Sequence, residues 1–162
     1  MGLADVVGSA KVKADKAEYL TVGNYPLLQV TFLKEYDKDG KLLFFANLDV
    51  LESVGDDAIA AGSPAVLCVD CVKYDNAFAG DVKKFLGAVT GMDPEKLDTS
   101  DVADALDPEQ PLKGMVVACV ATPKPLKSDP TKFVTLTKFT PAGEGAAERA
   151  VQRRLELGLA AL

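Results

Sequence analysis

The sequence contains no histidine, no tryptophan and only three cysteines. Without histidine, the chain cannot build a Ser-His-Asp triad, a Cys-His dyad, a histidine general base or a mixed Cys/His zinc site. No run approaches the roughly eighteen apolar residues of a membrane span, and the N-terminal residues lack the basic and apolar regions of a secretory signal. We therefore expect a protein that works inside a cell or is packaged in a particle, with no membrane partner.

The three cysteines, Cys68, Cys71 and Cys119, are expected to be free buried thiols. The Cys68-x-x-Cys71 spacing is shared by redox and metal motifs, but it lies in an apolar run of strand length. Residues three apart on a strand point to opposite faces, and no second cysteine pair completes a site. We therefore expect no metal and no cofactor.

The net charge of −6 over 162 residues is unevenly distributed. Residues 49–109 carry fourteen acidic and four basic side chains, whereas residues 110–142 carry five lysines and the single acid Asp129. Binding to a polyanion depends on such local patches more than on net charge. The basic segment is therefore a candidate contact surface.

Alternation of apolar and polar residues predicts strands from residue 23 to about 36, over 42–52, from 65 to about 74, over 115–121 and over 132–139. Asp39-Gly40 between the first two strands predicts a tight hairpin. In the first strand, Leu28, Val30 and Phe32 are expected on one face. In the second strand, the expected core face consists of Leu42, Phe44, Ala46, Leu48 and Val50. A helix is expected from an N-cap at Asp81 to about residue 91, with core positions Val82, Phe85, Leu86 and Val89. A shorter helix is expected over 99–106.

This order predicts a mainly β fold with α: a five-stranded OB-like barrel with a helix between strands three and four and a C-terminal amphipathic helix. We divide the chain into an arm (1–22), an OB-like domain (23–142) and the C-terminal helix (143–162). The apolar stripe of that helix is expected to pack on its own barrel or on a neighbouring copy, which would make a homo-oligomer. The stripe consists of Ala147, Val151, Leu155, Leu159 and Leu162.

In an OB-fold, a polymer lies across strands two and three, between the loop joining strands one and two and the loop joining strands four and five. Aromatic rings stack on bases and lysines neutralise phosphates there. The same residue types also occur as ordinary cross-strand pairs and solvated loops, an alternative that the sequence leaves open. The candidate nucleic-acid-binding residues are Phe45, Asn47, Lys73, Tyr74, Lys124, Lys127, Lys132 and Phe133.

Several segments resemble small bacteriophage proteins related to phage single-stranded DNA-binding proteins. They are Gly23-Asn24-Tyr25-Pro26-Leu27, Val50-Leu51-Glu52-Ser53, residues 80–91, residues 111–117 and Phe139-x-Pro141. The resemblance implies an OB-like fold, single-stranded DNA as partner, and a role in DNA replication or recombination in the cytoplasm of the infected bacterial host. Many such proteins end in an acidic tail, whereas this chain ends in apolar residues 157–162 and carries its acidic cluster at residues 93–109.

Two other classes of function are compatible with the sequence. A virion structural protein, such as a capsid decoration or cement subunit, suits an acidic, strand-rich domain with an arm and a packing helix. An enzyme is the less favoured alternative: Asp49, Glu52, Asp70 and Asp75 would have to gather around Mg²⁺. No phosphate-loop or dinucleotide fingerprint is present, so we expect a protein that is not an enzyme.

Overall fold

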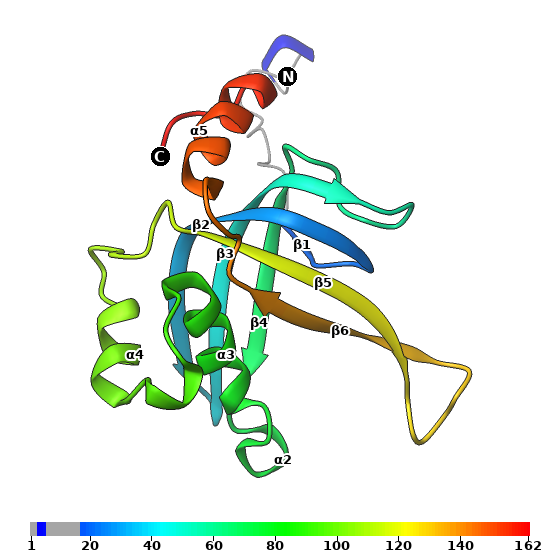
Figure 1. The fold of residues 1–162 in the computed structure, drawn as a ribbon. Helices are drawn as coiled ribbons and strands as arrows, with labels where there is room; N and C mark the ends of the chain where they lie inside the picture. The colour runs from blue at the N-terminus through cyan, green and yellow to red at the C-terminus, as the bar shows by residue number, and fades with distance from the viewer. Residues whose placement is uncertain (1–2, 6–16) are drawn as a thin grey trace.

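The computed structural model describes residues 3–5 and 17–162, which form a mixed α/β fold. Six strands make one sheet that curls into a half-barrel, in the order β1-β4-β3-β2-β5-β6 (Figure 1). The strands are β1 (Glu18–Tyr19), β2 (Gly23–Lys38), β3 (Lys41–Val54), β4 (Pro64–Asp70), β5 (Val116–Pro125) and β6 (Phe133–Thr140). The helices are α2 (Lys73–Asn76), α3 (Ala79–Thr90), the 3-10 helix η1 (Pro94–Lys96), α4 (Thr99–Ala105) and α5 (Ala146–Leu157).

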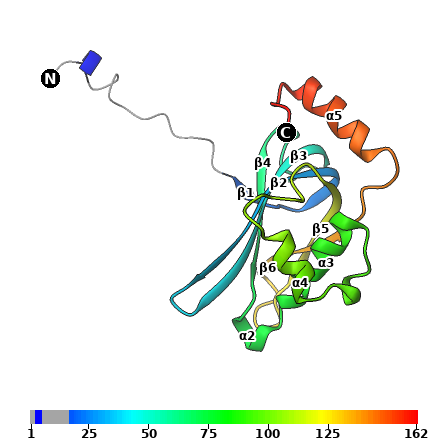
Figure 2. The same ribbon diagram turned by 90° about the vertical axis from the view of Figure 1, so that its left-hand side faces the viewer.

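The hairpin of β2 and β3 confirms the turn predicted from Asp39-Gly40. Both residues have positive φ, 56° and 73°, the conformation of the two-residue turns that match the twist of paired strands. The hairpin extends well away from the rest of the molecule (Figure 2). On β3 the predicted inner face is confirmed at its four central positions, which are all buried: Phe44, Ala46, Leu48 and Val50.

A β-bulge in β2 reverses the alternation predicted for this strand. The pairing of β2 with β3 skips Thr31, whose hydroxyl donates a hydrogen bond to the Asn47 carbonyl at 3.0 Å. An extra residue shifts every later side chain to the opposite face. Leu33 is therefore buried and Phe32 is 41% exposed, so the prediction that Phe32 shares a face with Leu28 and Val30 is wrong.

Helix α3 packs against the inner face of the curled sheet, and its four predicted core residues are buried. The ring centroid of Phe85 lies 5.9 Å from that of Phe44 on β3 and 5.0 Å from that of Phe139 on β6, so one aromatic residue bridges distant strands. The helix begins after the N-cap Phe78, and the predicted N-cap Asp81 is wrong: it lies in the first turn. Its carboxylate still favours the helix there, because the first turn is the positive end of the helix dipole.

The five predicted strands are present, but a closed five-stranded barrel is not confirmed. Closure would pair β4 with β6, and no such pairing occurs in the described part of the chain. The third strand ends at Asp70 and not near Tyr74, which lies in α2 with a φ of 52°. The edge of β4 pairs instead with β1, in parallel. This short strand lies inside the predicted arm, of which residues 1–2 and 6–16 are outside the described residues.

Helix α5 packs on the outer face of the sheet, opposite α3. Its buried residues are Ala146, Ala150 and Arg154, with the two alanines against Leu27 and Leu51. Val151 and Leu155, from the predicted apolar stripe, are 63% and 71% exposed. The centre of this stripe therefore does not pack on the protein's own sheet, which leaves the neighbouring copy as the open alternative.

Candidate nucleic-acid interface

The hairpin of β2 and β3 presents aromatic and basic side chains on one face. Beyond the bulge, the pairing register is continuous, so residues directly opposite each other share a face. Phe32 is opposite Asn47, Lys34 is opposite Phe45 and Tyr36 is opposite Leu43. We call this surface the hairpin face; it consists of Phe32, Lys34, Tyr36, Lys38, Lys41, Leu43, Phe45 and Asn47.

Charges of opposite sign are separated by the alternation of β2. Lys34 and Lys38 lie on the hairpin face with Lys41, whereas Glu35 and Asp37 alternate with them and point to the other side of the strand. None of the three lysines forms an ion pair with the residues that the structure describes. The hairpin face is therefore cationic although the chain as a whole is acidic.

The rings of the hairpin face are accessible to a ligand. Phe32 and Tyr36 are each 41% exposed, and Phe45 is half-buried between them on the neighbouring strand. The Lys34 ammonium lies over the Phe45 ring, 5.3 Å from its centroid, a distance typical of cation–π contacts. The face therefore combines flat apolar surfaces with mobile positive charges.

Strand β4 continues the same face beyond β3. Cys68 is opposite Phe45, and Asp70 is opposite Leu43. Burial raises the pKa of the Cys68 thiol, and the charge of Asp70 adds to the effect, so this thiol is neutral at physiological pH. The Asp70 carboxylate accepts hydrogen bonds from the amides of Val72 and Lys73 at 3.2 and 3.1 Å, which directs it to its own chain.

A polar cluster under α5 ends the hairpin face. The Arg154 guanidinium is 8% exposed and donates hydrogen bonds to the Asp49 carboxylate at 2.7 Å and to the Gln29 side-chain carbonyl at 3.1 Å. Its Nε donates to the carbonyl of Ala160 at 2.7 Å. The Arg149 Nε also pairs with the Glu52 carboxylate at 3.0 Å. These contacts cover β2 and β3 on the side of the bulge away from the hairpin turn.

Half of the predicted site residues lie on or beside the hairpin face. Phe45 and Asn47 belong to it. Lys73 and Tyr74 follow β4, where the Cys71 amide donates to the Leu42 carbonyl and holds the connection next to the turn end of the hairpin. The Lys73 ammonium lies 5.1 Å from the centroid of the exposed Tyr74 ring.

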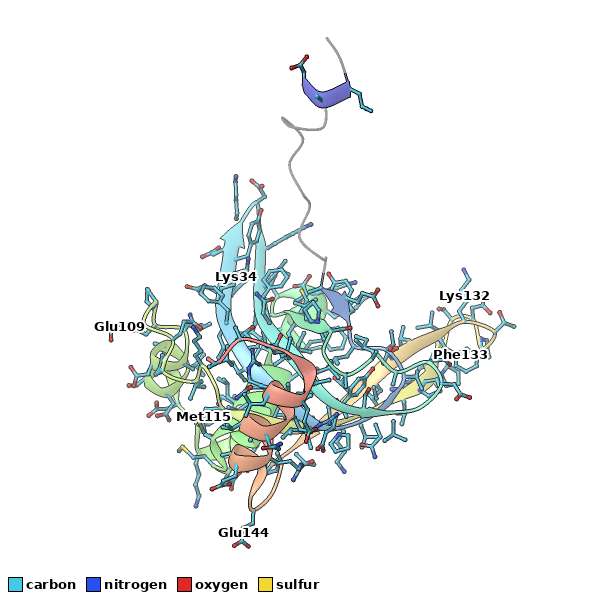
Figure 3. All side chains as sticks on the ribbon, turned by 90° about the horizontal axis from the view of Figure 1, so that it is seen from above. Lys34, Glu109, Met115, Lys132, Phe133 and Glu144 are labelled. Carbon is cyan, nitrogen blue, oxygen red and sulfur yellow. The ribbon has the colours of Figure 1, made fainter. Side chains whose placement is uncertain are left out.

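The other half lies where β5 and β6 extend beyond the rest of the sheet: the last pair of β5 with β2 is Ala121 with Gly23. We call this extension, residues 122–136, the arm; it is distinct from the N-terminal arm predicted for residues 1–22. Lys124, Lys127, Lys132 and Phe133 all belong to the arm. Figure 3 shows Lys34 on the hairpin and Lys132 and Phe133 at the tip of the arm, which points in a different direction. The structure therefore does not gather the eight predicted residues into one site.

A groove of about 1220 Å³ separates the two sheet edges that a closed barrel would join. It is bordered by β4, α3 and β6, and residues 124–127 of the arm line one end. Its charged side chains are of both signs, three carboxylates and four lysines: Asp70, Asp81, Asp93, Lys84, Lys124, Lys127 and Lys138. The Lys84 ammonium lies 3.9 Å from the Asp81 carboxylate. The lysines of the groove are thus mixed with carboxylates, whereas those of the hairpin face are separated from the carboxylates of their own strand.

The acidic residues considered for Mg²⁺ do not form a metal site. Asp49 and Glu52 are paired with arginines of α5, and Asp70 bonds to its own backbone. Within the described residues, no group of three or more potential ligands stands close enough to hold a metal ion. The magnesium hypothesis is therefore wrong for this cluster.

Six residues of the hairpin face were not predicted from the sequence: Phe32, Lys34, Tyr36, Lys38, Lys41 and Leu43. The i, i+2 alternation of the four on β2 is visible in the sequence. It was masked because the phase was set from Leu28 and Val30, on the other side of the bulge. No local feature of the sequence marks Thr31 as the bulged residue.

Comparison with models of known protein families, with curated proteins and with solved structures gives no match to this chain. None of the helices in the described residues has the length and apolar character required to cross a lipid bilayer. The function must therefore be argued from the surface itself.

Proposed function

We propose that this protein binds single-stranded DNA without sequence preference, through the hairpin face. The observation that carries the proposal is the separation of side chains along the hairpin: three rings and three lysines face one way, and Glu35 and Asp37 face the other. Proteins that hold single strands without reading sequence combine stacking rings with a cationic track.

The rings supply the sequence-independent contacts, because every base has a flat π-face. Phe32, Phe45 and Tyr36 lie on adjacent strands, so consecutive unstacked bases can each meet one ring. Stacking of a base on Phe45 displaces the Lys34 ammonium from the ring and frees it for a phosphate. Duplex DNA keeps its bases stacked inside, so these rings favour single strands.

The lysines supply the salt-dependent part of the affinity. Each phosphate that Lys34, Lys38 or Lys41 neutralises releases counterions from the strand. The flexible stems suit a backbone of variable geometry, because an ammonium group is a point charge without directional demands. Asn47, opposite Phe32, adds a neutral hydrogen-bonding group.

The curled half-barrel is compatible with an OB-like ancestry in which β2, β3 and β4 correspond to the first three strands. With the resemblance to phage single-stranded DNA-binding proteins, this supports a role in phage DNA replication or recombination in the bacterial cytoplasm. The arm, with Lys127, Lys132 and Phe133, then forms a second cationic surface for the DNA strand where it leaves the hairpin.

Fluorescence anisotropy of a labelled oligo-dT, at low and moderate salt, tests the proposal. We expect binding that weakens steeply as salt rises. Phe45→Ala should weaken it by about 1–3 kcal/mol, or roughly 5- to 150-fold, as for other stacked bases. Replacing Lys34 with alanine should lower the slope of log K against log salt by about 0.7.

Two variants serve as matched controls. Met92 is an exposed large apolar residue after α3, on the groove, and Met92→Ala should leave the affinity unchanged. Lys113, an exposed lysine before β5, plays the same part for the charge variants. No binding at low salt, or equal losses in Phe45→Ala and Met92→Ala, would refute the proposal.

A further inference from the structure

Helix α5 contacts the sheet through two alanines and one arginine, and its large apolar residues at 151 and 155 face outward. Its guanidinium Arg154 is buried while Leu155 and Val151, large apolar residues, point to solvent. Glu148 lies on the same outward side of the helix, about one turn before Val151 and two turns before Leu155. We call Glu148, Val151 and Leu155 the helix stripe. Within the described residues nothing covers the stripe, and Arg154 fixes the helix so that it cannot turn toward its own sheet.

A second uncovered apolar surface lies on the outer face of the β5–β6 hairpin, and four of its five residues also line the groove between β4, α3 and β6. Val120 is opposite Lys138, and Val134 is opposite Lys124, so these four side chains share a face with Leu136, two residues after Val134. We call these five residues the arm patch; its three apolar members are each about half exposed. This face is opposite the one on which Phe139 meets Phe85 in the core.

The two surfaces have complementary charge. The helix stripe contains Glu148 and follows Glu144, whereas the arm patch contains Lys124 and Lys138. None of these four charges forms an ion pair with another described residue. An apolar strip flanked by acids therefore matches an apolar strip flanked by lysines, while two copies of either surface would bring like charges together.

We infer that the helix stripe of one copy docks on the arm patch of the next copy. On one chain the two surfaces lie apart, α5 at the top of the view and the arm at the lower right (Figure 1). Each copy can therefore use both at once. A contact between two different surfaces does not close on itself unless the rotation brings the copies into a ring, so it produces a linear array.

The contact is weak between free molecules. Each surface offers only a few partly exposed apolar side chains, well below the ~800 Å² per partner of a standard stable interface. A DNA strand that holds neighbouring copies side by side raises their effective concentration. The same contact between copies then makes their binding to DNA cooperative. This second part rests on the proposed function; the docking of copies does not.

Two double variants replace apolar by uncharged polar side chains and so test each surface on its own. They are Val151→Gln with Leu155→Gln on the helix stripe, and Val134→Thr with Leu136→Thr on the arm patch. Val54→Gln, at an exposed apolar residue outside both surfaces, is the matched control. In sedimentation velocity over a concentration series, wild type and control should grow beyond dimers. Each double variant alone should stay monomeric, and their equimolar mixture should form dimers and nothing larger, because one intact stripe and one intact patch remain.

The outcomes are distinct. If the arm variant still dimerises while the helix variant does not, α5 pairs with itself and the inference is overturned. If wild type remains monomeric at every concentration and binds long oligo-dT no better per site than short oligo-dT, it is overturned as well. We expect about a tenfold advantage on the long strand, lost in both double variants. Self-association without any DNA binding would refute the proposed function and leave the docking intact.

Discussion

The docking of α5 through a buried arginine makes a prediction that inverts the usual rule for amphipathic helices. Arg154→Ala should destabilise the protein far more than Leu155→Ala, although leucine is the apolar residue. Arg154 bonds three acceptors on Asp49, Gln29 and Ala160, whereas the Leu155 side chain is 71% exposed.

The magnitude follows from what each substitution leaves behind. Removing one partner of a buried ion pair costs about 3–5 kcal/mol, because the other charge stays in a poorly solvated place. The Asp49 side chain is 19% exposed, so water solvates its unpaired carboxylate in part. We therefore expect a loss of stability at the lower end of this range, about 3 kcal/mol. Leu155→Ala removes atoms already in water and should change stability by less than about 0.5 kcal/mol.

Urea unfolding followed by circular dichroism measures both values, with hydrogen exchange of the α5 amides to detect local undocking. A double-mutant cycle isolates the pair: Arg154→Met with Asp49→Asn should cost less than the sum of the two single variants, since no charge is left unpaired. A larger loss in Leu155→Ala than in Arg154→Ala would refute the described orientation of the helix.

Two further predictions concern the core. Gly87→Ala should lower the free energy of unfolding in urea by about 1–3 kcal/mol, because the new Cβ would lie 2.8 Å from both the Met92 carbonyl oxygen and Pro94 Cγ. Gly80→Ala on the same helix is the control: its Cβ would meet nothing within 4 Å, so it should be neutral or stabilising. Similar losses in both variants would contradict this packing. Burial raises the pKa of Cys119 from 9.0 to about 12, so the folded state keeps a neutral thiol while the unfolded state ionises. Stability should therefore fall as pH rises from 9.0 to about 12, and Cys119→Val should reduce that fall; an unchanged pH profile would contradict it.

Local patterns were sufficient to predict most elements of the fold. The Asp39-Gly40 turn, the inner face of β3 and the four core positions of α3 all depend on residues close in sequence. The boundary at Asp70 was missed, because the strand ends when the carboxylate accepts the next backbone amides, an interaction that alternation does not report. The openness of the barrel depends on whether two distant edges meet, and no local pattern contains that information.

The candidate site was predicted only in part for a related reason. Phe45 and Asn47 were found because β3 alternates without interruption. The arm residues were grouped with them on the assumption of a barrel whose loops converge, and the open sheet carries the arm away from the hairpin instead. The apolar stripe of the C-terminal helix was expected to pack on the protein's own barrel or on a neighbouring copy. The side of α5 that meets the sheet depends on Asp49, about a hundred residues earlier in the chain.

The two failures of the hydrophobic pattern have one physical origin. At Thr31 a hydroxyl bonded to a carbonyl stabilises the extra residue, and the alternation that follows turns Phe32 outward. At Arg154 three polar bonds outweigh the preference of Leu155 for the interior. In both places specific hydrogen bonds hold large apolar side chains in water, at a cost of roughly 1.5–3 kcal/mol for each fully exposed side chain. Binding of a partner recovers that cost, which is why we locate the two proposed contacts, with DNA and with a second copy, at these two surfaces.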